Sequence, residues 1–191
     1  MNKVILFMTV LTFAVVAGCG GGGGGSKVTI TKADNLFDDG DYQDAQDAYV
    51  SLIASEGAPA IAGAAWCSIR LHNYAQADSF FSAAGVTLNA DGLAGWSFAS
   101  WALNDPQDAL DHATAALAAN PAFTTLSIDP LVTSNHLIWI QASSYLQLDN
   151  PTECYNKIHL LDAGFAMPTG NAQQIASALL TKLTSLGVAV G

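Results

Sequence analysis

The chain contains few basic residues. Its 191 residues include six Lys and Arg against sixteen Asp and Glu, which gives a formal net charge of -10. Proteins that bind nucleic acid use clustered Lys and Arg to displace counterions from the phosphates. The sequence has no such cluster, so we expect no nucleic-acid partner. Proline is also scarce, with six residues, whereas apolar residues make up 51% of the chain. This composition is typical of a folded globular domain rather than a disordered one.

Residue patterns that support catalysis or metal binding are also missing. The four histidines are not spaced as metal-ligand pairs. They are His72, His112, His136 and His159. The acidic residues between Asp34 and Asp47 lack the ligand order of a calcium-binding loop, and we interpret them as helix caps and solvated helix ends. Cys67 and Cys154 have no companion histidine and are expected to be buried free thiols. We therefore predict no catalytic, cofactor or metal site, and no enzymatic activity.

The N-terminal segment is predicted to be an export signal. Lys3 precedes an apolar run from Val4 to Val16, which is shorter than the about 20 residues that a membrane-spanning helix needs. A short apolar run after a positive start is typical of a signal peptide. Residues 16–19, Val-Ala-Gly-Cys, resemble a bacterial lipobox. The resemblance implies a signal peptide over residues 1–18, cleaved before Cys19, and lipidation of Cys19 with fatty acids such as palmitate.

Residues 19–26 join the predicted lipid anchor to a Gly-rich, flexible tether. Two or more acyl chains hold a protein stably on a membrane, whereas one chain does not. In the lipoprotein family an Asp after the cysteine favours the inner membrane, and this chain has Gly20 there. We therefore expect a lipid-anchored protein of the cell envelope, at the outer membrane rather than the inner membrane if the host is Gram-negative, and facing either the periplasm or the cell surface.

Residues 27–191 are predicted to form one helical domain with internal repeats. A short segment begins at Gly40, recurs 32 residues later at His72 and again at Asn104, and has a fourth copy at Asp149. Each copy continues with a good helix N-cap residue and has Asp, Gln or Glu three residues further on. The N-cap residues are Asp41, Asn73, Asp105 and Asn150. Each copy also follows an apolar stretch with helical spacing, so the predicted unit is a helix, a short turn and a second helix.

Residues 40–49 have the pattern Gly-Asp-Tyr-x-x-Ala-x-x-x-Tyr, which resembles the turn and second helix of a tetratricopeptide repeat. Ala142 and Tyr145 match the small and aromatic positions of a first helix in this family, and Asn120-Pro121 matches its closing proline. The resemblance covers about residues 30–162. It departs from the family in its spacing of 32, in lacking the Leu-Gly pair of the first helix, and in an insertion over residues 122–135.

The resemblance implies an all-α, tetratricopeptide-like solenoid of about four helix pairs. A last helix from Asn171 to about Leu186, ended by Gly187, is the expected C-terminal capping helix. A helical bundle without repeats remains the alternative.

In this family the first helices line a concave groove, which makes their aromatic and basic residues candidates for contact with a partner. The candidate groove residues are Trp66, Arg70, Trp96, Trp101, Trp139 and Tyr145. The alternative role for the tryptophans is to fill the core between repeats. The resemblance predicts a non-enzymatic, lipid-anchored scaffold or adaptor that binds a protein or peptide. The alternative is a surface or periplasmic lipoprotein that binds a ligand such as a glycan.

Overall fold

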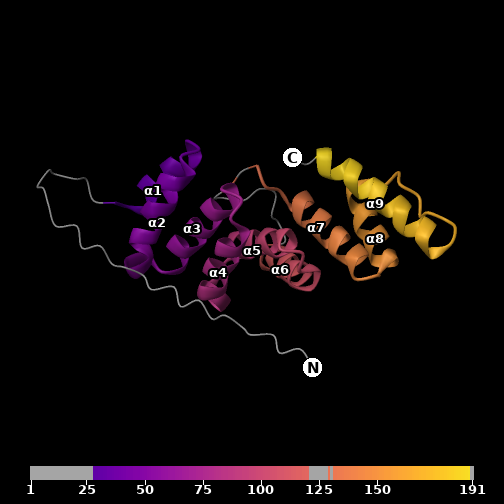
Figure 1. The fold of residues 1–191 in the computed structure, drawn as a ribbon, viewed down its shortest axis with the longest axis horizontal. Coiled ribbons are helices and arrows are strands. Elements are labelled where there is room, and N and C mark those ends of the chain that lie inside the picture. The colour runs from indigo at the N-terminus through magenta and orange to yellow at the C-terminus, as the bar shows by residue number, and fades with distance from the viewer. Residues whose placement is uncertain (1–27, 121–128, 130, 190–191) are drawn as a thin grey trace, which may run out of the picture.

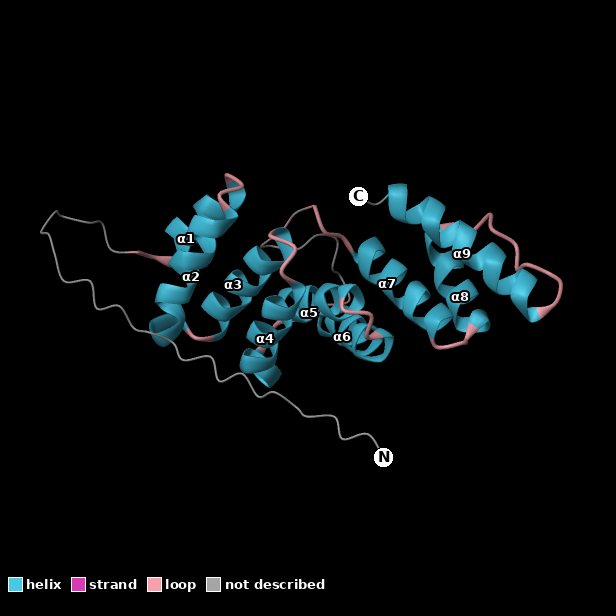
Figure 2. Cartoon of the chain, viewed as in Figure 1, coloured by secondary structure: helices cyan, strands magenta, loops and turns pink. Residues whose placement is uncertain are grey.

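The computed structural model describes residues 28–120, 129 and 131–189 (Figure 1). Every regular element in these ranges is a helix, and Figure 2 shows the helices stacked along one curved, elongated row. The elements are α1 (Ile30–Asp38), α2 (Tyr42–Glu56), α3 (Ala58–Arg70), α4 (Tyr74–Ala84), the short 3-10 helix η1 (Gly85–Thr87), α5 (Ala90–Ala102), α6 (Pro106–Ala119), α7 (Ser134–Gln147), α8 (Pro151–Leu161) and α9 (Ala172–Ala189).

The helices of the described ranges form the predicted solenoid. Four helical hairpins, α1/α2, α3/α4, α5/α6 and α7/α8, follow one another, and α9 packs on α7 and α8 (Figure 1). Contacts between hairpins join each second helix to the next first helix, as in a stack of repeats. The all-α fold of about four helix pairs with a C-terminal helix is therefore confirmed.

The four turns within the hairpins share one backbone conformation. Gly40, His72, Asn104 and Asp149 have φ angles of 85°, 58°, 61° and 55°, which places all four in the left-handed region. In each turn the next residue donates its N–H to a carbonyl five residues earlier, as Asn73 does to Ser68 at 2.8 Å. This is the Schellman arrangement that ends many helices. The repeat detected in the sequence is thus a repeat of turn geometry.

The predicted N-cap residues all occupy the N-cap position, but only two of them cap with their side chains. Asp105 accepts from the backbone N–H of Asp108 at 3.2 Å, and Asn150 accepts from that of Glu153 at 3.2 Å. Asp41 and Asn73 form no side-chain cap, and the prediction was wrong in this respect. The amide of Asn73 instead donates to the Gln76 side chain at 2.9 Å.

A bulky ring and a glycine meet where one hairpin packs on the next. A Cβ placed on Gly63 of α3 would lie 2.4 Å from Cε1 of Tyr49, and one on Gly95 of α5 would lie 2.4 Å from Cζ of Phe81. Both rings are at most 1% exposed. The two contacts are related by the spacing of 32 residues, so the same close approach of ring to backbone is used twice.

At the third junction between hairpins, the large residue lies on the first helix of the following hairpin and the small residue lies on the second helix of the preceding one. The positions equivalent to Phe81 and Gly95 hold Ala113 on α6 and Ile140 on α7, and both are buried. The summed side-chain volume is thereby kept roughly similar, which is the condition under which close-packed interfaces tolerate changes of residue. The spacing of the repeat is lengthened here by the inserted segment.

The C-terminal helix closes the stack. Leu179 and Leu183 of α9 are buried against α7 and α8 in a second hydrophobic cluster. Trp139 of α7 packs on both this cluster and the larger one formed by the preceding hairpins. Gly187 was predicted to end α9, but the helix continues to Ala189. Gly187 instead lies against the Trp139 indole, where a Cβ would be 3.2 Å from the ring, so its role is packing rather than termination.

Part of the predicted insertion packs against the helices of the solenoid. Of residues 122–135, the structure describes Asp129 and 131–135. Asp129 is 2% exposed and forms an ion pair with Arg70 at the end of α3. Val132 is buried in the larger hydrophobic cluster. The insertion therefore contributes to the core.

The predicted signal peptide (1–18) and the predicted anchor and tether (19–26) lie outside the described residues. Within the ranges that the structure describes, no helix has the length and apolar character needed to cross a bilayer.

Candidate functional site

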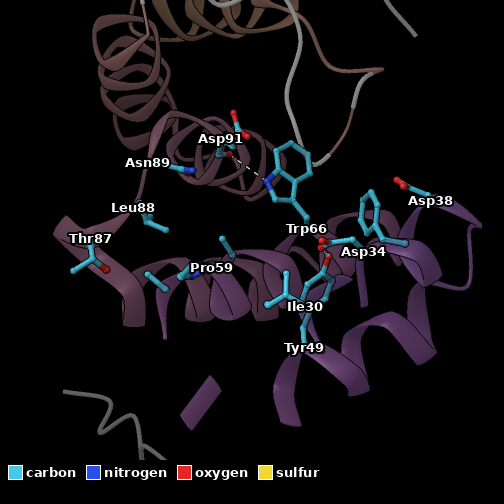
Figure 3. A pocket seen from close by; sticks show the side chains of 13 residues that line it. Ile30, Asp34, Asp38, Tyr49, Pro59, Trp66, Thr87, Leu88, Asn89 and Asp91 are labelled. Atoms are coloured by element: carbon cyan, nitrogen blue, oxygen red, sulfur yellow. Dashed lines mark hydrogen bonds between the residues drawn. The ribbon is translucent and has the colours of Figure 1, made fainter. Parts of the chain in front are cut away.

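A cavity of about 550 Å³ opens near the N-terminal end of the solenoid, between α1, α3 and the start of α5. Its walls include Ile30 of α1 and Pro59 of α3, and the segment Thr87–Asn89 before α5 closes one side (Figure 3). First helices supply most of the lining, as expected for the inner surface of such a solenoid. The volume lies within the range of about 300–1,000 Å³ that is usual for ligand pockets.

The floor of the cavity is held by hydrogen bonds. The indole N–H of Trp66 donates to the Asp91 carbonyl oxygen at 3.2 Å (Figure 3), which links α3 to α5. The Tyr49 hydroxyl donates to Oδ1 of Asp34 at 2.5 Å, which links α2 to α1. Burial, followed by this hydrogen bond and the Asp34 charge, raises the pKa of Tyr49 far above its ordinary value. Tyr49 therefore stays neutral and acts as a fixed donor to the carboxylate.

The rim of the cavity is acidic. Asp34 and Asp38 lie one helical turn apart on α1, and Asp91 lies across the cavity on α5, with Trp66 between the two sides (Figure 3). The described residues that line the cavity include no Lys or Arg. The site therefore combines an aromatic floor with three carboxylates at its rim.

Only one of the six candidate groove residues lines this cavity. Trp66 forms its floor and is 1% exposed. Arg70, one helical turn further along α3, is half-buried and its guanidinium pairs with Asp129. Its charge is thereby compensated within the chain. The groove role of both residues stays a prediction.

The other three tryptophans make contacts between helices. Trp96 stacks on the His112 ring with centroids 3.9 Å apart and donates to Asp78 at 2.8 Å, which joins α5 to α6 and α4. Trp101 meets the edge of Trp139 with centroids 5.1 Å apart. Their N–H groups donate to Ser143 Oγ at 3.1 Å and to the Leu183 carbonyl at 2.8 Å, respectively.

Tyr145 packs against the second cluster, beside α8 and α9. None of the four indoles is exposed, so each contributes to packing between hairpins.

Apart from Trp66, the acidic and aromatic residues of the inner surface were not predicted from the sequence to be functional. Asp34 and Asp38 were interpreted as solvated helix ends, and Asp91 and Phe98 were not singled out. Asp34, Trp66 and Phe98 are equivalent positions at the spacing of 32, and the rings of Trp66 and Phe98 lie 6.0 Å apart. Aligning first helices on the turns would have placed these residues on one surface.

The remaining reactive groups are not arranged as a catalytic or metal centre. Cys67 and Cys154 are buried free thiols, as predicted, and burial raises the pKa of each to about 12. A thiol with this pKa stays protonated at neutral pH and is a poor nucleophile. Among the described residues, no group of three or more His, Cys, Asp and Glu side chains could hold a metal ion.

Comparison with known proteins identifies the fold. No protein-family model and no curated protein matches the sequence. A tetratricopeptide repeat protein from Parabacteroides merdae matches the structure with a TM-score of 0.55 and 17% identity over 82% of this chain and 59% of that chain. This chain thus spans 59% of the length of that protein. YrrB, described as a tetratricopeptide repeat protein with an unusual peptide-binding site, matches with a TM-score of 0.59 and 17% identity over 82% of this chain and 84% of its own. The chain has the fold of a tetratricopeptide-like solenoid.

Proposed function

We propose that this protein is a non-enzymatic scaffold of the cell envelope, anchored by lipid on Cys19, which binds a protein or peptide on the inner surface of its helical repeats. The observation that carries the proposal is the cavity between α1, α3 and α5. It is concave, it has an aromatic floor, and it is lined by residues from successive repeats. The peptide-binding site named for YrrB supports the same use of the fold here.

The absence of catalytic chemistry is part of the proposal. The cavity is lined by carboxylates and apolar side chains, and its Tyr49 hydroxyl is engaged with Asp34. The two thiols lie in the hydrophobic clusters and do not line the cavity. Glycan binding has less support because carbohydrate sites commonly use an exposed aromatic face, and no indole of this chain is exposed.

A photocrosslinking experiment in living cells tests the binding role. A photoreactive amino acid replaces Pro59, which is exposed and lines the cavity, or Asp47, which is exposed on α2 and does not line it. We expect irradiation to join a defined partner protein to the first variant and not to the second. Equal crosslinking from both positions, or none from either, would contradict a partner held on the inner surface.

The lipid anchor requires its own test. Cells are grown with an alkyne-bearing fatty acid, and the labelled protein is detected after coupling to a fluorophore. We expect the wild-type chain and a Gly20→Ser control to carry the label and to fractionate with membranes. The Cys19→Ser variant should lose both properties, because the thiol is the proposed attachment point. A Cys19→Ser chain that still carries label would end the anchoring proposal.

A further inference from the structure

The cavity between α1, α3 and α5 has properties that select among peptide chemistries. Its floor is apolar and aromatic, with Phe37, Trp66 and Leu88 in the lining. Its rim carries the carboxylates of Asp34 and Asp38. An apolar side chain would lose water on entering such a floor, while a charged group beside it would lie at the rim. The ligand therefore needs an apolar group and a charged group within a few atoms of each other.

The two carboxylates of α1 have no cationic partner among the described residues. The ion pairs within these ranges are Arg70–Asp129 and Lys182–Asp162, so neither Asp34 nor Asp38 is in one. Their charges point to a cation supplied from outside. Their spacing of four residues puts them on the same face of α1, about one turn apart.

Nearby cations do not compensate this charge. Arg70 lies one turn beyond Trp66 on α3, but its guanidinium is paired with the buried Asp129. Lys32 is exposed and lies two residues before Asp34, which places it about 200° around the helix. A peptide carboxylate at the rim would meet repulsion, whereas a Lys or Arg side chain would be attracted.

The part of the cavity that a ligand can reach is apolar. Ile30, Pro59 and Leu88 line it and are half-buried or exposed, whereas Trp66 and Phe37 are 1% and 5% exposed and fill the space behind the lining. Trp66 is fixed by its hydrogen bond to Asp91, so this side of the cavity does not need to be ordered when a ligand binds.

We propose that this cavity binds a cationic peptide segment in which an aliphatic or aromatic residue stands next to Lys or Arg. The apolar side chain packs against Ile30, Pro59 and Leu88, and the basic group lies between Asp34 and Asp38 at the rim. This inference rests on the proposed function and specifies the chemistry of its partner.

A peptide library tests the charge preference. Capped hexapeptides randomised at all six positions are presented to the full-length chain in a non-ionic detergent, and bound peptides are sequenced. We expect Lys and Arg next to apolar residues to be enriched among bound peptides, and Asp and Glu to be depleted. The Asp34→Asn/Asp38→Asn variant should lose the enrichment, and the Kd of the best basic peptide should rise by roughly fivefold to tenfold. The wild-type Kd should also rise with salt.

The matched control is Asp44→Asn/Asp47→Asn, which changes the net charge equally at exposed positions of α2 away from the cavity. It should bind the basic peptide as the wild type does. The amide oxygen that Asp34→Asn introduces would still accept the Tyr49 hydroxyl, so we expect the fold to survive, and circular dichroism checks this. Asp38→Asn alone, which alters an exposed residue, serves as the second variant if the double one unfolds.

The outcomes separate this inference from the broader proposal. Equal weakening by both double variants would indicate general attraction to an acidic protein and would overturn the inference. Selection of neutral or acidic peptides, or of none, would overturn it too. Crosslinking from position 59 to a partner protein does not depend on the charge of the peptide. A positive crosslink with no basic preference would therefore leave the proposed function standing while refuting this inference.

Discussion

Replacing Gly63 with Ala tests the junction between the first two hairpins. In a helix interior this change normally stabilises a protein by about 1 kcal/mol, because Ala has the higher helix propensity. Here the added Cβ would lie 2.4 Å from Cε1 and 2.5 Å from Cδ1 of Tyr49. The ring is 1% exposed and is held by Asp34, so it has little room to move. Overpacking of this kind costs about 3 kcal/mol at the upper end of its usual range, which leaves a net loss of about 2 kcal/mol.

Urea unfolding followed by circular dichroism measures this loss, and the melting temperature should fall by about 4–8 °C. Gly92→Ala is the matched control. It adds the same methyl group to α5, where the nearest atom is the flexible end of Leu88, at 2.6 Å. Leu88 is half-buried and can shift, so the control should stay within about 0.5 kcal/mol of the wild type.

A double variant sharpens the test. Tyr49→Leu removes the ring carbons that meet the new methyl group, so Gly63→Ala should cost less in that background than in the wild type. We expect a coupling of at least about 1 kcal/mol, which is typical of residues in direct contact. Additive effects, or a Gly63→Ala protein as stable as the Gly92→Ala control, would refute the packing argument.

Three further predictions concern the turns, the insertion and the thiols. His72→Gly should stabilise the fold by about 1 kcal/mol in urea unfolding, because His72 has a φ of 58° that suits Gly; no gain would contradict strain in this turn. Arg70→Met should cost about 3 kcal/mol by leaving the Asp129 carboxylate buried without its partner, and Asp129→Asn in the same chain should recover part of the loss. The pKa of Cys67 and Cys154 is raised from 9.0 to about 12, so the folded state keeps its protons while the unfolded state loses them as pH rises above 9. The free energy of unfolding should therefore fall by about 1.4 kcal/mol per thiol between pH 8 and pH 10. In a chain with both residues changed to Ala, the free energy of unfolding should fall by that much less over the same pH range.

The helical hairpins were predictable because their signals are local. A helix start depends on residues within four positions of each other, such as Asp105, Pro106 and Asp108, and the turn that precedes it recurs at a fixed spacing. The start of α9 was found for the same reason, since Asn171 and Gln174 cap each other reciprocally at 2.9 and 3.0 Å. The prediction for Gly187 was wrong because local propensity suggested an end, whereas contact with Trp139 keeps the glycine inside the helix.

The cavity was not predictable at the same level because its residues are brought together only by stacking. Asp34 and Asp38 carry the same local signals as the exposed acidic residues of α2, and they differ only in lining a cavity together with residues of α3 and α5. The contacts of the tryptophans were equally hard to predict. Trp96 donates to Asp78, 18 positions away on the preceding α-helix, whereas Trp101 and Trp139 donate to residues 42 and 44 positions away.

The order of the helices, their repeated turns and the acidic, cation-poor character of the chain follow from the sequence by itself, because propensity, capping and net charge act over short distances or over the whole composition. Tertiary structure alone decided which rings became core, which carboxylates faced the cavity, and that Arg70 is neutralised by a residue 59 positions away. Those outcomes depend on how rigid hairpins pack against one another. The Tyr49 ring can pack on Gly63 only after both helices have formed. Contacts of this kind then determine the shape of the inner surface.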